Sequence, residues 1–511
     1  MSAPDSTQNR SRLFVVAFAA IVATSFCFVL RAMVVDEWGV EFALTQTQKG
    51  ELLGVGLWPF SITIVLLSLF IDRIGFRAVL WLAALCHAAG LALLLSAQGY
   101  WALYIGTLVM ALGNGAVEAA ANPLVATLFR EDKSRWLNRV HAAWPGGLIA
   151  GGLLAMALGA HCPWRWKVAL MIVPVAVYAG LLLRQQFPVG ERVAFGVSYR
   201  AMLAEGGFMS AFVIIALMML EVGRVFALPL ALTAAVIGAL TAWYAVHARS
   251  AGRPLYLVFV LLMIPLATTE LSTDSWITSL MTPQMHALGL GAGWVLVYTA
   301  ALAFVIRIFA GSIIHAFKPL WVLAGAAAAA AAGLSLMSNA TGLAILGAAT
   351  LYGIGKSFFW GTSLGVVSER FPKGGALALN LIAGAGMLAA GILGSELLGA
   401  AQDAATVRAV VQYDAKEHTN LAQRYLSAEK TGLLGGYRAL DHDAAAHADA
   451  KDAALLASFA EEGKKGALAD VALLPAVMLV VYLLLVAYFR TQGGYRPVDL
   501  GARPTETASS S

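Results

Sequence analysis

Residues 112–138 read LGNGAVEAAANPLVATLFREDKSRWLN, and residues 354–380 read IGKSFFWGTSLGVVSERFPKGGALALN. Each stretch is an apolar segment with an early glycine, followed by a basic turn and then by Leu-Asn at the start of another apolar segment. The spacing is the same in both stretches, so that Gly113 corresponds to Gly355. A repeat of this kind indicates that the chain contains two related halves, each built from several helices.

The composition is typical of a membrane protein. Of the 511 residues, 60% are hydrophobic and only 12% are charged, whereas a soluble chain carries about 25% charged residues. The 50 glycines suit the same environment, because small residues allow membrane-spanning helices to approach closely. The three cysteines lie on different segments and indicate no disulfide framework. The formal charge of +5 is small, and we expect no nucleic-acid partner.

Apolar runs of about 20 residues predict membrane-spanning helices. We expect about 14 of them, which makes the chain an all-α polytopic membrane protein. The runs occupy residues 12–36, 49–71, 77–97, 101–129, 140–160, 166–184, 206–226, 228–247, 253–280, 290–315, 319–338, 341–368, 375–400 and 470–489. The pair at 206–226 and 228–247 is interrupted by charged residues and a proline, and either crosses the membrane twice or lies at its surface.

Basic residues alternate between the two sides of the predicted bundle. Alternate loops carry several Lys and Arg, whereas most of the opposite loops carry almost none. This bias predicts a multi-pass protein of the plasma (inner) membrane with both termini in the cytoplasm. We expect an N-terminal six-helix half at 1–190, a linker with an inserted helix pair at 191–252, and a C-terminal six-helix half at 253–511. The segment 401–469 should form a helical insertion on the outer side.

Two parallel halves with a solute site near the membrane midplane are typical of the major facilitator architecture. The turn DRIGFR at residues 72–77 resembles the signature cytoplasmic loop of that superfamily, with Ser68 in place of its usual leading glycine. The resemblance covers nearly the whole chain, and it implies a transporter in which this loop takes part in the conformational change. The loop residues concerned are Asp72, Arg73, Gly75 and Arg77.

One branch of the superfamily is similar over a shorter stretch, at about residues 110–150. The segment EAAANPLV at 118–125 resembles the Glu-Thr-Ala-Ala-Asn-Pro-x-Val stretch of the fucose and glucose permeases, which are sugar–proton symporters. The Leu-Asn pair that ends at Asn138 resembles the opening of their fifth helix, with His141 where that branch has Gln. This resemblance implies that Glu118 carries the proton and that Asn138 and His141 contact the solute.

Charged side chains inside membrane spans are costly, and each is therefore a candidate for a functional site. Glu118 lies in the middle of the fourth span, with Asn122 on the same helix face four residues later. Glu118 is the first candidate for proton coupling, because an apolar environment favours the neutral acid. Glu270 is the second. Arg31 and Glu270 lie at similar depth in opposite halves, which suggests a gate or a relay, although Arg31 can also extend to the interface.

Lys356 lies within an apolar span and needs a counter-charge, for which Glu118 and Glu270 are the available candidates. Asp274 shares a helix face with Glu270 and either binds solute or lies at the interface. Arg307 is interpreted as a residue that holds a loop at the cytoplasmic end of its helix.

Two tryptophans, Trp144 and Trp360, would either stack on a sugar ring or pack within the bundle. The complete set of predicted solute-binding residues is Arg31, Asn122, Asn138, His141, Trp144, Lys356, Trp360 and Asp274.

We expect a secondary active transporter that couples protons to the symport of a sugar or a related small polar solute by alternating access. One alternative is a proton-driven antiporter of organic anions or drugs, with Arg31 and Lys356 holding the anion. A remote alternative is a membrane sensor without transport, which the buried Glu118 disfavours. No catalytic triad, metal cluster or nucleotide-binding loop is recognisable, so we expect no enzyme activity and no cofactor beyond the proton gradient. The expected partners are a small-molecule solute and the lipid bilayer, and the expected state is a monomer.

Overall fold

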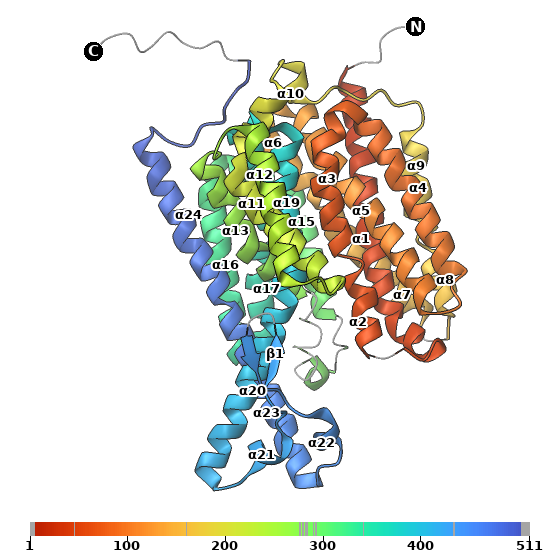
Figure 1. Ribbon diagram of the computed structural model, residues 1–511, viewed down its shortest axis with the longest axis vertical. Helices are drawn as coiled ribbons and strands as arrows, with labels where there is room; N and C mark the ends of the chain where they lie inside the picture. The colour runs from red at the N-terminus through yellow and green to blue at the C-terminus, as the bar shows by residue number, and fades with distance from the viewer. Residues whose placement is uncertain are drawn as a thin grey trace.

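The computed structural model describes residues 6–44, 46–159, 161–274, 277, 281, 285–289, 291, 294–340, 342–432 and 435–501. Figure 1 shows an upright bundle of long helices with a smaller cap at one end, called the cap end below. α1 (Ser6–Glu41) begins and α24 (Leu473–Thr491) ends at the opposite end, called the terminal end. In the described part of the chain, 13 helices are long and apolar enough to cross a membrane, so the predicted polytopic α-helical fold is confirmed.

Six spans come from helices α1 to α9. The bounds of the later helices in this group are α2 Gln46–Gly54, α3 Trp58–Ile74, α4 Phe76–Leu95, α5 Tyr100–Leu128, α6 Lys133–His141, α7 Ala143–Leu158, α8 Trp164–Ala169 and α9 Ile172–Leu182, with a 3-10 turn η1 at Arg130–Asp132. α2 and α3 form one span, as do α6 and α7, and α8 and α9.

The remaining spans begin with the inserted pair, α11 (Tyr199–Val225) and α12 (Leu230–Ala248), which follows the short helix α10 (Glu191–Ala194). Both helices of the pair stand parallel to the bundle in Figure 1, α11 packs against α19, and both are among the helices long and apolar enough to cross a membrane. The later elements are α13 Pro254–Ala267, η2 Thr268–Ser272, α15 Trp294–Phe317, α16 Pro319–Asn339, α17 Ala344–Ser357, α18 Phe359–Arg370, η3 Pro372–Gly374, α19 Gly375–Ala389 and η4 Ala390–Gly394.

Two local departures from the α-helix lie beside charged residues. The predicted span at 341–368 is divided at Phe358 into α17 and α18, two residues after Lys356. The π-helical turn η2 contains Glu270. It follows Pro265, which has no backbone N–H to donate, and the hydroxyl of Thr269 donates to the Pro265 carbonyl at 2.7 Å. Such departures often occur at functional sites.

The glycines of the repeat allow two pairs of helices to pack closely. A Cβ atom added at Gly113 on α5 would lie 3.0 Å from the carbonyl oxygen of Ala83 on α4. A Cβ atom added at Gly355 on α17 would lie 2.5 Å from the carbonyl oxygen of Ala326 on α16. The repeat therefore preserves the same close contact between neighbouring helices in each half.

The two asparagines of the repeat each bond to the opposite half. Asn138 Nδ2 donates to Thr362 Oγ1 at 3.2 Å, and Asn380 Nδ2 donates to the carbonyl oxygen of Ala119 at 2.9 Å. Gly361 leaves room for the first contact, because a Cβ atom there would lie 2.8 Å from the Cα of Asn138. The two halves are thus joined by a pair of matching contacts, one from each copy of the repeat.

Further contacts hold the halves together at the terminal end. Lys133 on α6 donates to the carbonyl oxygen of Ser368 on α18 at 3.2 Å, and its ammonium group also pairs with Glu191 at 2.6 Å. The hydroxyl of Ser134 donates to the carboxylate of Glu369. These contacts join α6 of the first half to the end of α18 in the second half.

The cap is built from helices and one short hairpin (Figure 1). Its elements are α20 Ser395–Glu417, α21 Leu421–Tyr425, β1 Lys430–Gly432, β2 Gly435–Tyr437, α22 His442–Ala446 and α23 Ala450–Val471, with β1 and β2 antiparallel. The cap has a small hydrophobic core of its own, which includes Val410, Leu421 and Phe459. The hairpin was not predicted from the sequence.

Candidate functional site

A cavity between the two halves brings together side chains from several spans. It is lined by Phe60, Ile64, Glu118, His141, Trp144, Glu270, Leu271, Arg307, Trp360 and Met387. Five of the predicted site residues are in this set, namely Glu118, His141, Trp144, Glu270 and Trp360. Glu118 follows Gly113 by five positions, as Trp360 follows Gly355, so the repeat contributes one matching side chain to the cavity from each half.

Glu118, Asn122 and His141 form a chain of hydrogen bonds beside the cavity. Glu118 and Asn122 lie four residues apart on α5, which places their side chains on one face of the helix. Asn122 Nδ2 donates to Glu118 Oε2 at 2.8 Å, and Asn122 Oδ1 is 2.8 Å from His141 Nε2. With this assignment of the amide, His141 Nε2 is the donor to Asn122. The chain links the acid to a side chain of α6.

Glu118 differs from the nearby acids Glu270 and Asp274 in its partners. It is only 4% exposed, and the part of the chain that the structure describes gives it no Lys, Arg or His ion pair. Its described hydrogen-bond partner is the neutral amide of Asn122. Burial without a cation penalises the ionised form of a carboxyl group, so this environment suits an acid that binds and releases a proton.

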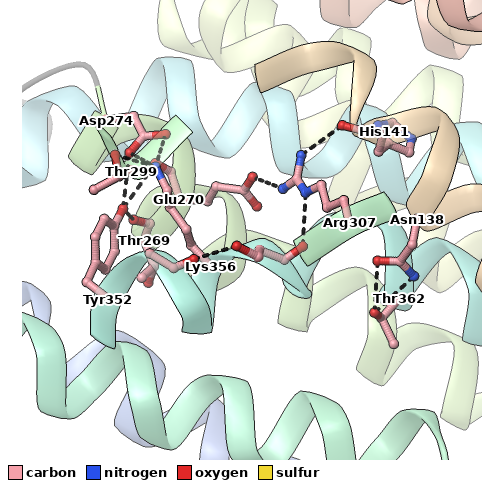
Figure 2. Close-up of polar contacts among 12 residues, drawn as sticks. Asn138, His141, Thr269, Glu270, Asp274, Thr299, Arg307, Tyr352, Lys356 and Thr362 are labelled. Atoms are coloured by element: carbon pink, nitrogen blue, oxygen red, sulfur yellow. Dashed lines mark hydrogen bonds and ion pairs between the residues drawn. The ribbon is translucent and has the colours of Figure 1, made fainter. Parts of the chain in front are cut away.

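Glu270 pairs with Arg307. Arg307 Nη2 lies 2.5 Å from Glu270 Oε1. The same guanidinium donates from Nε to the carbonyl oxygen of Ser357 at 2.9 Å and from Nη1 to the carbonyl oxygen of His141 at 3.1 Å (Figure 2). Because His141 belongs to the first half, Arg307 connects the acid of η2, the break after α17 and the opposite half of the bundle.

The interpretation of Arg307 as a residue that holds a cytoplasmic loop was wrong. Arg307 is 2% exposed and lies ten residues before Phe317, the last residue of α15. At about 1.5 Å per residue, this separation places Arg307 roughly 15 Å from the end of the helix. Its depth is therefore that of the cavity.

Lys356 and Asp274 form the second ion pair. Lys356 Nζ lies 2.5 and 2.7 Å from the two carboxylate oxygens of Asp274 and 3.3 Å from Thr299 Oγ1. The ammonium group also lies 5.3 Å from the ring centre of Tyr352, whose hydroxyl donates to the carbonyl oxygen of Thr269 at 3.0 Å. Figure 2 shows this group of residues beside the Glu270 pair.

The prediction that Glu118 or Glu270 compensates Lys356 was wrong. Glu270 and Asp274 both belong to the segment around η2, and each of them receives a different cation from the second half. Arg307 neutralises Glu270, which leaves Asp274 for Lys356. Asp274 thus has a defined partner within the bundle.

We expect Lys356→Ala to destabilise the protein strongly, because the substitution leaves the Asp274 carboxylate without its cation. Removal of one partner of a buried pair costs about 3–5 kcal/mol. The measurement is thermal unfolding in detergent, with Lys318→Ala, at an exposed position, as the control. Lys356→Met combined with Asp274→Asn should recover part of the loss. An unchanged melting temperature for Lys356→Ala would show that the pair does not stabilise the fold.

Arg31 is buried but does not take part in either ion pair. It is 1% exposed, and its Nε has no hydrogen-bond partner among the described residues. The guanidinium lies against Gly56, at the break between α2 and α3, and its Cζ is 5.7 Å from the ring centre of Phe28. The side chain does not extend to an interface, and the proposed relay with Glu270 has no contact to support it, because Glu270 pairs with Arg307.

The other predicted residues lie away from the cavity. Asn138 is used in the contact with Thr362 and is fully buried. In the 72–77 turn, Asp72 pairs with Arg192 at 2.5 Å, the guanidinium of Arg73 lies 5.5 Å from the ring centre of Tyr199, and Gly75 has a φ of 87°. Arg77 is exposed. The turn is therefore attached to the segment that follows the first half.

Several residues of the cavity and of the neighbouring Lys356–Asp274 pair were not anticipated from the sequence. Arg307 carried a detectable signal, because a charged residue deep inside an apolar run indicates a site. Thr299 and Tyr352 carried none, since hydroxyl groups are common in membrane helices. The same holds for the apolar lining residues Phe60 and Met387.

Comparison with known proteins agrees with this architecture. The family model described as Major Facilitator Superfamily matches residues 13–395. The chain belongs to this superfamily. It is accordingly a membrane transporter of small solutes rather than an enzyme.

Solved structures of other facilitators share the fold at low sequence identity. The Escherichia coli fucose:proton symporter is 16% identical with a TM-score of 0.55, and the alignment covers 92% of this chain and 98% of that one. A proton:xylose symporter is 14% identical with a TM-score of 0.60, covering 95% and 96%. The human organic anion transporter is 13% identical with a TM-score of 0.57, covering 93% and 99%. At these identities the likeness concerns the fold alone.

One curated relative matches a shorter stretch of this facilitator. The class E tetracycline resistance protein of Escherichia coli is 30% identical over 146 residues, which are 28% of this chain. The match spans only 33% of the length of that relative.

Proposed function

We infer that this facilitator is a secondary active transporter that carries a sugar or a related small polar solute together with protons by alternating access. The observation that carries the proposal is the environment of Glu118. It lines the cavity between the halves, it is buried, and it has no cation partner in the described part of the chain. The acids Glu270 and Asp274 are each neutralised by a cation, which leaves Glu118 as the acid best suited to carry a proton.

Asn122 provides the physical link between protonation and solute binding. Its amide donates to Glu118 and accepts from His141 in the same chain. A protonated Glu118 no longer requires the donor of Asn122 in the same way, so the amide can bond to a solute hydroxyl instead. Affinity for solute then depends on the proton, which is the thermodynamic requirement for coupling. The ring faces of Trp144 and Trp360, which line the same cavity, suit stacking against a sugar ring.

A second candidate function is proton-driven antiport of organic anions or drugs. The observation in its favour is the buried guanidinium of Arg31, which has no acidic partner among the described residues. The human organic anion transporter and the tetracycline resistance protein are also among the similar proteins. Symport is preferred because of the Glu118–Asn122 motif.

Orientation and environment complete the proposal. The Lys and Arg bias of the loops supports an inner-membrane protein with cytoplasmic termini, which places the cap outside. Labelling of a single cysteine introduced into the cap, applied from the outside of intact cells, tests this orientation. Labelling from the inside only would reverse it. The energy source proposed is the proton gradient, without a bound cofactor, and the proposed state is a monomer.

The experiment that tests the function is uptake into proteoliposomes of a panel of hexoses, deoxyhexoses and organic anions, with and without a pH gradient. We expect at least one member to accumulate when the outside is more acidic. Antiport would give the opposite dependence on the pH gradient. An organic anion would then accumulate inside only when the outside is the more alkaline compartment.

A further inference from the structure

Arg31 is held in a site that fits its guanidinium closely and in which no described residue forms an ion pair with it. A Cβ atom added at Gly56 would lie 2.0–2.2 Å from the two terminal nitrogens and the central carbon of the guanidinium, so only glycine leaves room for it. On the other side lies the ring of Phe28. Burial of an uncompensated cation is costly, and such a residue in a membrane span normally pairs or takes part in transport.

Every described acid on the neighbouring part of α1 and α2 has a partner other than Arg31. The pairs are Asp36 with Lys49 at 2.9 Å, Glu37 with Lys167 at 2.6 Å, Glu41 with Arg165 at 2.7 Å, and Glu51 with the hydroxyl of Tyr100 at 2.5 Å. The end of α1 and the helix α2, which carry these acids, lie at the cap end of the first half. The chain therefore contains acids close by in sequence but uses none of them to neutralise Arg31.

The position of Arg31 connects it to the cavity. Phe28, which lies under its guanidinium, is 5.9 Å from Trp144 between ring centres, and Trp144 lines the cavity. Gly56, which also contacts the guanidinium, lies four residues before Phe60, and Phe60 lines the cavity as well. Arg31 does not line the cavity itself, but the ring contacts of Phe28 and Trp144 connect its guanidinium to the space proposed for the solute.

Of the charged side chains in and around the cavity, Arg31 is the cation without an acidic partner among the described residues. Arg307 is paired with Glu270, and Lys356 is paired with Asp274. One cation, Arg31, and one acid, Glu118, remain without an ion pair among the described residues. The six charges sum to zero when Glu118 is ionised and to one positive charge when Glu118 is protonated. Binding of one solute carboxylate would return the sum to zero.

We propose, on the basis of the symport function above, that the solute is an acid of sugar size, such as a hexuronate or an aldonate, whose carboxylate binds Arg31. One proton on Glu118 accompanies one carboxylate on Arg31. The proton raises the affinity for the anion by removing the competing negative charge of Glu118, and loss of the proton on the other side releases the anion. The two ligands are coupled through the field of the cavity and need no direct contact.

Other polar groups face these two residues. Glu118 faces Asn122 and His141, and the Glu270–Arg307 pair lines the same cavity. Cys27 lies one turn before Arg31 on α1 and is buried. The Glu270 and Arg307 charges cancel, so Glu118 is the group whose protonation changes the charge that Arg31 experiences.

Transport of an acid and transport of a neutral sugar should respond differently to membrane potential. A monovalent acid carried with one proton moves no net charge, whereas a neutral sugar carried with one proton moves one positive charge. A potential of about 100 mV should therefore change the accumulation of a neutral sugar by roughly 50-fold and that of the acid not at all. The experiment measures uptake of glucuronate, galacturonate and gluconate against glucose and galactose in proteoliposomes, with a pH gradient and with a potassium–valinomycin potential.

The outcomes separate this inference from the function on which it rests. Accumulation of an acid with the pH gradient, unchanged by the potential, supports the proposal. Accumulation of a neutral sugar alone, increased by an inside-negative potential, keeps proton symport and overturns the acid. Accumulation of an acid that responds to the potential overturns the one-to-one coupling. Failure of every acid and sugar to accumulate removes the proposed symport and this inference with it.

Variants of Arg31 give a second test. Arg31→Gln should weaken binding of the transported acid at least tenfold, measured by thermal shift of the purified protein, and Arg31→Lys should recover part of the affinity. Arg165→Gln is the matched control, because Arg165 is half-exposed and paired with Glu41. In Glu118→Gln the affinity for the acid should lose its pH dependence. Tight binding of the acid by a folded Arg31→Gln variant would contradict the proposal.

Discussion

Glu118→Gln should abolish accumulation of solute by a pH gradient while solute still exchanges across the membrane. Glutamine has the shape of the protonated acid but cannot release a proton. With one proton per solute, a gradient of one pH unit supports about tenfold accumulation in the wild type. In the variant the ratio of inside to outside solute should stay near one. The measurement compares pH-driven uptake with counterflow, in which labelled solute exchanges against unlabelled solute without a gradient.

The control for this substitution is Glu221→Gln. Glu221 on α11 is also buried, but it is paired with Arg224 at 2.6 Å and lies outside the cavity. We expect its accumulation ratio to match that of the wild type. If Glu118→Gln accumulates solute as well as the wild type does, the proton site lies elsewhere, and Glu270 becomes the first candidate. If the variant loses both counterflow and accumulation, the defect lies in solute binding rather than in coupling.

The second large effect is expected at Arg307. Arg307→Lys should reduce transport by at least about 100-fold, because an ammonium group cannot reproduce the three bonds of the planar guanidinium. The substitution would disturb the contact with Glu270 and the contacts with the carbonyl groups of Ser357 and His141. Leaving a buried charge unpaired costs about 3–5 kcal/mol. Even a partial loss of these contacts should therefore lower the transport rate strongly.

Two further variants distinguish a role in transport from a role in folding. Arg307→Met combined with Glu270→Leu removes both charges, so it should fold better than Arg307→Met alone and still fail to transport. Arg224→Lys is the control, because Arg224 forms a two-point contact with Glu221 outside the cavity. Normal transport by Arg307→Lys would show that the link between Glu270 and the first half has no part in the cycle.

Much of the architecture followed from patterns along the chain. Runs of apolar residues located the spans, and the repeat located the glycines that allow close helix contacts, because both depend on local composition and spacing. The Glu118–Asn122 pair was also predictable, since residues four apart share a helix face. Glu118 and Trp360 occupy matching positions of the repeat. The sequence alone does not show that both side chains line one cavity, because this depends on how the two halves pack.

The pairing of charges was not predictable. Lys356 bonds Asp274 and Arg307 bonds Glu270. Glu270 lies in the π-helical turn η2 and Asp274 follows the end of that turn by two residues, and such a turn leaves no clear trace in hydropathy. Asn138 was expected to contact solute and instead bonds Thr362 across the halves. Each of these contacts joins segments far apart in sequence, and their geometry depends on tertiary packing rather than on local pattern.

The central claim is that a proton travels with the solute through Glu118, and solute-driven proton movement tests it most directly. A pH-sensitive dye enclosed in proteoliposomes reports the internal pH when a transported solute is added outside at equal pH on both sides. We expect internal acidification with the wild type and with Glu221→Gln, and none with Glu118→Gln, although that variant still exchanges solute. Acidification by Glu118→Gln at the wild-type rate would contradict the account.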